Sequence, residues 1–239
     1  AWPRRSHAWI GVGLSALLCW ALGCSPGTTW DEAMAAGQQA YRQGRFDDAE
    51  RIFSAAVVKA EQFGRDDTKL ALSLSQLGQA YWSQGRYAEA EPVYVRALQI
   101  YQRTYGEEHL DVAAALNNLG VLHRMHGQYA EAEPLLRRAL ATKEKLLGPD
   151  HPDIALSLRN LGKLYGAQGR YAQAEPLYRR ALAIREQALG AEHQEVAKSL
   201  EELAEVLRQA GRAQEAEALQ ARAAVIRGQR SPQSTRARG

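Results

Sequence analysis

The chain has 239 residues, of which 46% are apolar and 24% are charged, a balance typical of a folded protein and not of a disordered one. The strong helix formers Ala, Leu, Glu, Gln and Arg dominate, so we expect an all-helical fold. A net charge of +3 is too small to steer nucleic acid to the protein. The only cysteines, Cys19 and Cys24, lie near the N-terminus, which excludes a disulfide or a thiolate metal site in the rest of the chain.

Residues 1–23 are predicted to be an export signal. Arg4 and Arg5 form a basic start, and an apolar run of 15 residues follows from Ala8 to Leu22. That run is shorter than the about 20 residues that a membrane-spanning helix needs, and it suits the apolar core of a secretory signal. Removing Arg4 and Arg5 from the 30 basic residues leaves 28 against 27 acidic ones, so the body is close to neutral.

The tripeptide ALG before Cys24 resembles the lipobox of bacterial lipoproteins, although that family prefers Leu where this chain has Ala21. The resemblance implies that Cys24 is lipidated and becomes the first residue. It also implies, through Ser25, an outer-membrane anchor on the periplasmic side of the envelope. A plain signal peptide or an uncleaved short anchor is the alternative. Residues 24–29 are expected to form a short tether.

The rest of the chain carries a motif that recurs every 42 residues. Nearly identical segments begin at Gly85, Gly127 and Gly169 and read GRYAEAEPVYVRAL, GQYAEAEPLLRRAL and GRYAQAEPLYRRAL. An earlier copy begins at Gly44, 41 residues before Gly85, and a looser fifth copy begins at Gly211. A fixed period of this length is typical of a solenoid, in which similar supersecondary units stack on one another.

Each repeat is predicted to form a hairpin of two helices. In the second repeat, Leu74, Leu77 and Tyr81 share one stripe of a first helix, and Gly85 ends that helix. Small residues such as Gly78 recur where the two helices must approach closely. The hairpin leaves one apolar side, which only the next hairpin can bury.

A proline recurs near the start of each second helix in the middle repeats. We expect it to cost little there, because most amides of a first helical turn lack an intrahelical partner. These prolines are Pro92, Pro134 and Pro176. Glutamates that recur beside them are expected to lie on capping or solvated faces. They are Glu89, Glu91, Glu131, Glu133 and Glu175.

Three histidines, His109, His151 and His193, recur in the linkers between hairpins. They do not predict a metal site, since residues one repeat apart are separated by about the 8–10 Å of packed helices, whereas metal–nitrogen bonds are about 2 Å. Each histidine is expected to pack or hydrogen-bond within its own linker. The first linker has Asp67 in the same place.

The pattern L-x-x-L-G-x-x-Y, G-x-Y-x-x-A-E-P-x-Y and L-G-x-x-H-P-D-I-A resembles tetratricopeptide repeats, in the 42-residue form of kinesin light chains and their bacterial relatives. The resemblance covers about residues 30–227. It implies an all-α, right-handed α-solenoid of five helix-turn-helix hairpins, with atypical capping repeats at both ends. The expected repeats are residues 30–70, 71–112, 113–154, 155–196 and 197–227. The tail, residues 228–239, has three arginines and no acidic residue and is expected to be disordered.

In tetratricopeptide domains the first helices line an inner face that holds extended peptides. The resemblance implies that Asn118 and Asn160 hold a peptide backbone there, whereas Gln76 matches the family in part and Glu202 departs from it. Neighbouring columns of the repeat add further candidates for this face. They are Gln79, Trp82, Asn117, Arg124, Arg159 and Lys163.

Three of these candidates, Arg124, Arg159 and Lys163, are basic, so acidic or carboxylate-ended peptides are the ligands that we expect. The alternative is that these positions are ordinary solvated polar residues, and Trp82 has the further alternative of packing within its hairpin.

The sequence contains no phosphate-binding loop, nucleophile motif or HExxH, so we expect no catalytic residues, cofactor, metal or nucleic acid. We therefore expect a non-enzymatic interaction scaffold or peptide-binding module of the bacterial cell envelope. The alternative is a dedicated adaptor, regulator or chaperone-like partner of one envelope or secreted enzyme.

Overall fold

The computed structural model describes residues 28–228, and every regular element in that range is helical. The predicted all-α solenoid of helical hairpins is thereby confirmed. The predictions for the signal peptide (residues 1–23), for lipidation of Cys24 and for a disordered tail (residues 228–239) fall outside the described residues, apart from Gly228. Within residues 28–228, no helix combines the length and the apolar character needed to cross a membrane.

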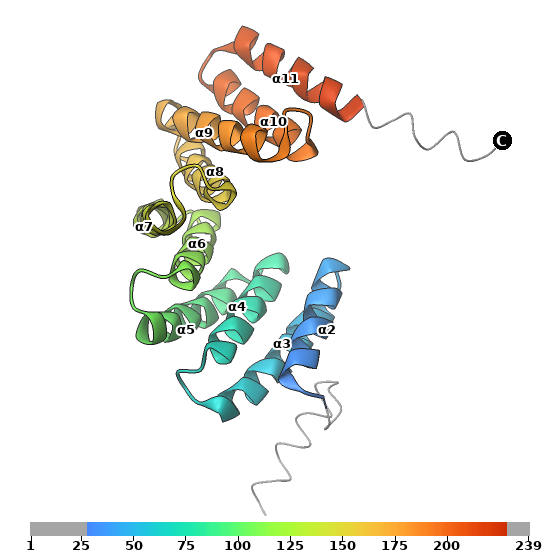
Figure 1. The fold of residues 1–239 in the computed structure, drawn as a ribbon, viewed down its shortest axis with the longest axis vertical. Helices are drawn as coiled ribbons and strands as arrows, with labels where there is room; N and C mark the ends of the chain where they lie inside the picture. Colours follow the sequence, from blue (N-terminus) through green and yellow to red (C-terminus); the bar gives the residue numbers. More distant parts are fainter. Residues whose placement is uncertain (1–27, 229–239) are drawn as a thin grey trace, which may run out of the picture. The chain divides into compact units, whose positions relative to one another are not determined.

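The chain divides into two compact units, residues 1–107 and 108–239, and each is described on its own. The described part of the first unit contains two helical hairpins (Figure 1). Its helices are α2 (Trp30–Arg42), α3 (Phe46–Ala60), the short 3-10 helix η1 (Glu61–Phe63), α4 (Thr68–Ser83) and α5 (Tyr87–Tyr105). The described part of the second unit contains three hairpins. Its helices are α6 (Leu110–Met125), α7 (Tyr129–Leu147), α8 (Pro152–Ala167), α9 (Tyr171–Leu189), α10 (Gln194–Gln209) and α11 (Ala213–Gly228).

The first helix of each hairpin begins with a side chain that caps it. The Nδ1 atom of His151 accepts a hydrogen bond from the backbone N–H of Asp153 at 3.2 Å, and Asp67 accepts one from the N–H of Lys69 at 2.7 Å. These bonds satisfy amide groups that the first helical turn would otherwise leave without a partner. The N-cap residues are Thr29, Asp67, His109, His151 and His193.

The three linker histidines therefore hydrogen-bond locally, which confirms their predicted role. Each Nδ1 atom lies 3.2 Å from the backbone nitrogen two residues later in its own linker. In the part of the chain that the structure describes, no group of three or more His, Cys, Asp or Glu side chains could hold a metal ion.

Glycines end the helices as expected. Gly85 follows α4 with a φ of 77°, and Gly148 directly follows α7 with a φ of 88°. Residues with a Cβ rarely adopt this left-handed conformation, so glycine lets the chain turn sharply into the next helix.

The two helices of each of the first four hairpins pack closely because the first helix has a glycine where the second has a large side chain. A Cβ added to Gly78 would lie 2.8 Å from a ring carbon of Tyr94, and one added to Gly120 would lie 2.6 Å from Cγ of Leu136. Both large side chains are buried, with exposed fractions of 4% and 1%. The small residues predicted from the sequence thus make room for the core.

The expectation for the recurring prolines was wrong in one respect. Pro92 is the sixth residue of α5, beyond the first turn, and Pro134 and Pro176 occupy the same place in α7 and α9. Each therefore removes an internal hydrogen bond of the helix. The site tolerates this loss because Pro92 and Ala88, whose carbonyl group loses its donor, are both exposed, so water can hydrogen-bond to that carbonyl.

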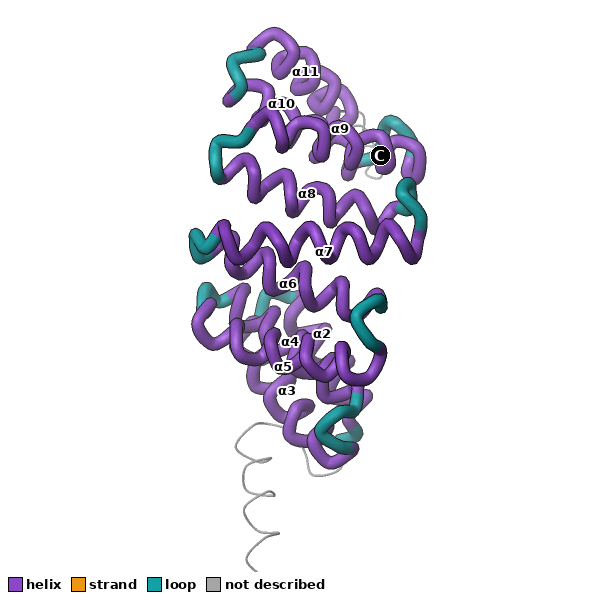
Figure 2. The backbone as a smooth tube through the Cα atoms, turned by 90° about the vertical axis from the view of Figure 1, so that its left-hand side faces the viewer, coloured by secondary structure: helices purple, strands orange, loops and turns teal. Residues whose placement is uncertain are grey.

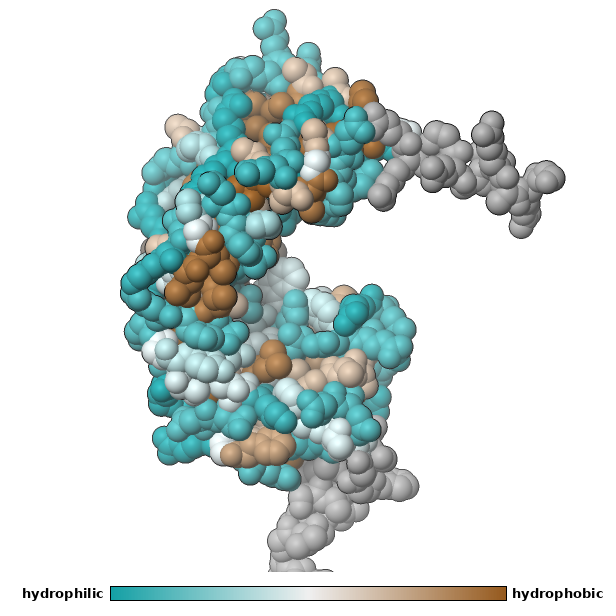
Figure 3. All heavy atoms as spheres, in the orientation of Figure 1, coloured by the Kyte–Doolittle hydropathy of each residue, from teal (hydrophilic) through white to brown (hydrophobic). Residues whose placement is uncertain are grey.

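Hairpins within each unit are joined by ion pairs between the second helix of one hairpin and the arginine that directly precedes the second helix of the next. Arg86 lies 2.7 Å from Glu50 in the first unit, and Arg170 lies 2.8 Å from Glu133 in the second. Glu133 and Glu175 are only 18% and 19% exposed, so these two glutamates bridge repeats and do not lie on solvated faces as expected. In the second unit α7, α8 and α9 lie side by side (Figure 2), which brings such pairs together. Hydrophilic residues cover most of the visible surface (Figure 3).

Candidate functional site

The first helices of the second unit present a stripe of side chains that the core does not use. On α6 the stripe is mostly apolar, with Asn118 and Val121 partly exposed and Met125 42% exposed. On α8 and α10 it is charged. The charged members are Arg159, Lys163, Lys198, Glu202 and Glu205.

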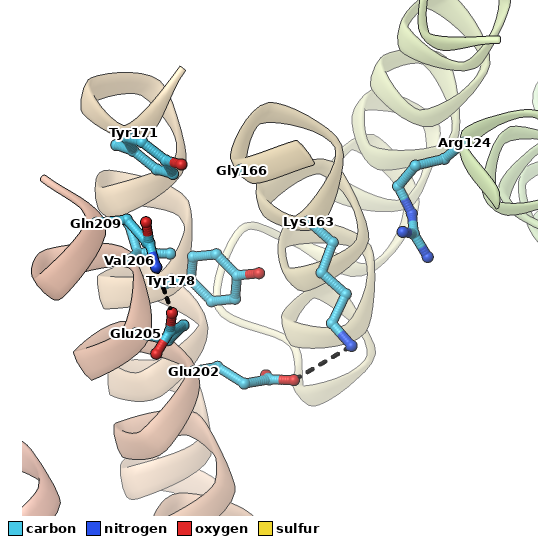
Figure 4. A pocket seen from close by; sticks show the side chains of 9 residues that line it. All are labelled: Arg124, Lys163, Gly166, Tyr171, Tyr178, Glu202, Glu205, Val206 and Gln209. Atoms are coloured by element: carbon cyan, nitrogen blue, oxygen red, sulfur yellow. Dashed lines mark hydrogen bonds and ion pairs between the residues drawn. The ribbon is translucent and has the colours of Figure 1, made fainter. Parts of the chain in front are cut away.

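A pocket of about 330 Å³ opens on this face (Figure 4). Its walls come from four helices of the second unit, α6, α8, α9 and α10. The lining residues are Arg124, Lys163, Gly166, Tyr171, Tyr178, Glu202, Glu205, Val206 and Gln209. The pocket is of the size at which small ligands or single side chains of a partner are held, and it combines apolar walls with a few charged groups.

Gly166 accounts for the space in the pocket. It stands in the same column of the repeat as Trp82 and Arg124, which have large side chains. A Cβ added to Gly166 would meet no atom within 4 Å. The fourth repeat thus lacks a side chain at the point where the pocket opens.

Glu202 ties the two basic residues of α8 to α10. Its carboxylate accepts hydrogen bonds from Nε of Arg159 at 2.7 and 2.6 Å, and Nζ of Lys163 lies 3.3 Å away. The exposed fractions of the Arg159, Lys163 and Glu202 side chains are 29%, 34% and 20%. Burial alone would raise the pKa of the Glu202 carboxyl, but the hydrogen bond and charge of Arg159 and the charge of Lys163 hold it below its ordinary value.

Arg124 is the exception among the basic residues of this face. No carboxylate of the described residues lies within salt-bridge distance of it, and its Nη2 atom donates a hydrogen bond to the sulfur of Met125 at 3.2 Å. Its Nε atom is buried and has no hydrogen-bond partner. Burial, together with the nearby charge of Arg159, lowers its pKa, and the guanidinium stays charged. Figure 4 shows Arg124 on a separate helix across the pocket from Tyr178.

The structure changes the expected role of the asparagines. Nδ2 of Asn160 donates to Oδ1 of Asn117 at 2.9 Å, and the two residues are only 9% and 8% exposed. They therefore link α6 to α8 inside the unit, and little of either side chain reaches the surface. Asn118 is partly exposed and keeps its place on the candidate face.

The expected availability of the basic residues also needs correction. Arg159 and Lys163 are already paired with Glu202, so Arg124 alone of the three lacks an acidic partner among the described residues. The sequence placed Glu202 in the right column but did not show that its side chain reaches back to the preceding repeat.

The remaining candidates, Gln76, Gln79 and Trp82, lie on α4 in the first unit and are partly exposed. The indole nitrogen of Trp82 is buried without a hydrogen-bond partner. Its predicted role, as a peptide anchor or in packing, stays a prediction.

The sequence-based prediction considered only first helices and therefore missed two pocket residues of a second helix, Tyr171 and Tyr178. Tyr171 is partly exposed, and Tyr178 is 6% exposed. The Gly166 column could have indicated them, since a missing side chain on the first helix uncovers the second helix behind it.

Comparisons with known proteins agree with this geometry. The family model for the tetratricopeptide repeat matches residues 31–103, 69–145, 127–187 and 165–227. The search of curated protein sequences gave no match. Among solved structures, BtubC (BKLC) from P. vanneervenii is 28% identical with a TM-score of 0.74, and the alignment covers 83% of this chain and 80% of that one.

Two further structures share the fold. A putative kinesin light chain of Podosopora anserina with nearly identical TPR-like repeats is 25% identical with a TM-score of 0.72, covering 83% of this chain and 94% of that chain. A Rap protein complexed with competence and sporulation factor has a TM-score of 0.67 at 19% identity, covering 82% of this chain and 54% of that one, which shows the fold alone. The repeats, the hairpins and the family match together establish that this chain belongs to the tetratricopeptide repeat family.

Proposed function

We propose that the protein is a non-enzymatic binding module that holds an extended segment of a partner protein on the first-helix face of its second unit. The tetratricopeptide fold is a scaffold for protein–protein interactions. The observation that carries the proposal for this chain is the pocket that holds Arg124, a half-buried arginine without an acidic partner among the described residues. Buried polar groups are normally hydrogen-bonded, so an Nε atom without a partner favours a ligand that supplies one.

The ligand that fits this site carries a carboxylate, either an acidic side chain or a free C-terminus. A guanidinium and a carboxylate form charge-assisted hydrogen bonds, which are about twice as strong as neutral ones. The ring of Tyr178 and the side chain of Val206 provide apolar wall in the same pocket, across from Arg124, so the carboxylate would be followed by an apolar part of the segment. Asn118 is partly exposed on the same face, and we expect its amide to hydrogen-bond the peptide backbone.

Fluorescence anisotropy with labelled peptide pools tests this function. One pool ends in free carboxylates and contains acidic residues, and its matched pool is amidated and has glutamine in place of glutamate. We expect wild-type protein to prefer the acidic pool, and Arg124→Gln to reduce that affinity about tenfold or more, as expected for loss of a charged hydrogen bond.

Arg179→Gln is the matched control, because Arg179 is an arginine of the same unit that lies outside the pocket and is 46% exposed. It should leave the affinity within about twofold, since exposed ion pairs contribute little. Equal effects of the two substitutions, or no binding of either pool, would contradict the proposed site.

We further propose that the protein is exported and anchored by a lipid on Cys24 to the periplasmic face of the outer membrane. The basic and apolar pattern before Cys24 and the small residues beside it support this location. Metabolic labelling with a palmitate analogue tests it, with Cys19→Ala as the control for Cys24→Ala, because these are the two cysteines of the chain. Label should persist in Cys19→Ala and disappear in Cys24→Ala, and label that persists in both would refute the anchor.

A further inference from the structure

Arg159 and Lys163 stand four residues apart on α8, so their side chains share one face of the helix. Two cations at this spacing, both less than 35% exposed, form a ready site for an anionic group. In this chain the site is already filled, because Glu202 of the next repeat lies within hydrogen-bond or ion-pair distance of both cations.

Glu202 occupies a position at which the three preceding repeats have a neutral amide. The column reads Gln76, Asn118, Asn160 and Glu202. A glutamate at this position has the negative charge and the side-chain length to contact the two cations of α8, as the carboxylate of an acidic ligand would. We propose that Glu202 is an internal carboxylate that occupies the Arg159–Lys163 anion site and restricts the binding face to ligands with a single negative group, held by Arg124.

This inference rests on the proposed binding face and adds its specificity. A segment with several acidic residues would place a second carboxylate near Glu202 and meet like-charge repulsion. A segment with one carboxylate would reach Arg124 without this penalty. Specificity of this kind uses a repulsive element against the wrong partner as well as an attractive one for the right partner.

Substitution of Glu202 separates this role from a merely structural one. The probes are an amidated hexaglutamate peptide and a matched amidated peptide with one glutamate and five glutamines, both carrying the same uncharged fluorophore. Glu202→Gln frees Arg159 and Lys163, and we expect it to bind hexaglutamate about tenfold or more tightly than wild type. Binding of the single-glutamate peptide should change less than about threefold, because Arg124 is unaltered.

The matched control is Glu205→Gln. Glu205 also lines the pocket from α10, but its side chain is 54% exposed and it pairs with Arg208 instead of the α8 cations. Glu205→Gln removes one negative charge, as Glu202→Gln does, but leaves Arg159 and Lys163 paired with Glu202. The affinity for hexaglutamate should therefore rise less than about threefold. The double variant Arg159→Gln/Glu202→Gln should lose most of the gain of Glu202→Gln.

Removing one partner of a partly buried ion pair can destabilise the fold, so a second variant keeps the test decisive. Glu202→Asn places in the last repeat the amide that Asn118 and Asn160 provide in the two before it, and circular dichroism checks its helicity. Folded Glu202→Gln or Glu202→Asn with unchanged hexaglutamate affinity would overturn the inference, and so would an equal gain in Glu205→Gln.

Different results would refute the proposed function and this inference. Wild-type protein that binds neither peptide pool would contradict the function, whereas a gain of hexaglutamate binding in the Glu202 variants would still establish the filled anion site. Peptide binding by wild type without any gain in the Glu202 variants would leave the function standing and refute the role of Glu202.

Discussion

Two glycines one turn apart on α8 have opposite surroundings, which makes them a test of how the hairpins are packed. A Cβ added to Gly162 would lie 2.8 Å from Cε2 and 3.1 Å from Cδ2 of Tyr178, much closer than the about 3.5–4.0 Å of carbon atoms in contact. A Cβ added to Gly166 would meet nothing within 4 Å.

Alanine stabilises a helix by about 1 kcal/mol relative to glycine, and this contribution favours both substitutions. Gly162→Ala adds the cost of overpacking against the buried Tyr178 ring, about 1–3 kcal/mol. We therefore expect Gly166→Ala to be as stable as wild type or up to about 1 kcal/mol more stable, and Gly162→Ala to be about 1–3 kcal/mol less stable than Gly166→Ala.

Urea unfolding followed by circular dichroism measures this difference, with equal m-values as the condition for comparing the two variants. The last hairpin has alanine in place of this glycine, since Ala204 stands in the Gly162 column. In the same hairpin the exposed Gln220 stands in the Tyr178 column, so no buried ring lies against the alanine. If Gly162→Ala were as stable as Gly166→Ala, the glycine would not be required by close helix packing, and this account of the repeat would be wrong.

Three other predictions concern single interactions and use the same unfolding assay. His151→Ala should lower the free energy of unfolding by about 1 kcal/mol through loss of the N-cap, and His151→Asp should restore it, because Asp67 caps α4 in the same way. Asn117→Ala should cost about 1–3 kcal/mol by leaving the amide of Asn160 buried without an acceptor, whereas leucine at both positions should cost less. Because the pKa of Glu202 in the folded state is lowered from 4.5, its ion pairs stabilise the fold above about pH 4.5, and this contribution is lost as the pH falls below it. Stability should therefore decline less steeply on acidification in Glu202→Gln, and an unchanged decline would contradict the stabilising ion pair.

The hairpins could be predicted from the sequence because each boundary depends on a local preference. Gly85 follows the end of α4 because glycine readily adopts the left-handed conformation that this position requires. Gly78 marks the contact with the second helix because a Cβ at this position would clash with Tyr94. The histidine caps were predicted only as local contacts, because spacing excludes a shared metal but does not identify the bonded amide. The prolines were misplaced because the sequence does not show how far a helix extends before its first proline.

The contacts on the proposed binding face were predicted less well, because they depend on side chains from different repeats. The columns put Asn160 and Arg159 beside each other on the first-helix face, and both residues lie on α8. Their partners are not visible in the columns: Asn160 turns to Asn117, and Arg159 turns to Glu202 in the following repeat. A long side chain can reach several ångströms in more than one direction, and only the packed neighbours decide which direction is used.

The sequence by itself determined the period, the helical hairpins, the glycine contacts and the family, since all of these follow from local conformational preference and from residues that recur at a fixed spacing. Only the tertiary structure decided which charges on the proposed binding face have an acidic partner among the described residues. Glu202 and the two cations of α8 lie roughly one repeat apart in the chain and meet only because α8 and α10 are held close in the second unit. Ion pairing falls off over a few ångströms, so the same composition can leave an arginine open to a ligand, as at Arg124, or neutralise it, as at Arg159.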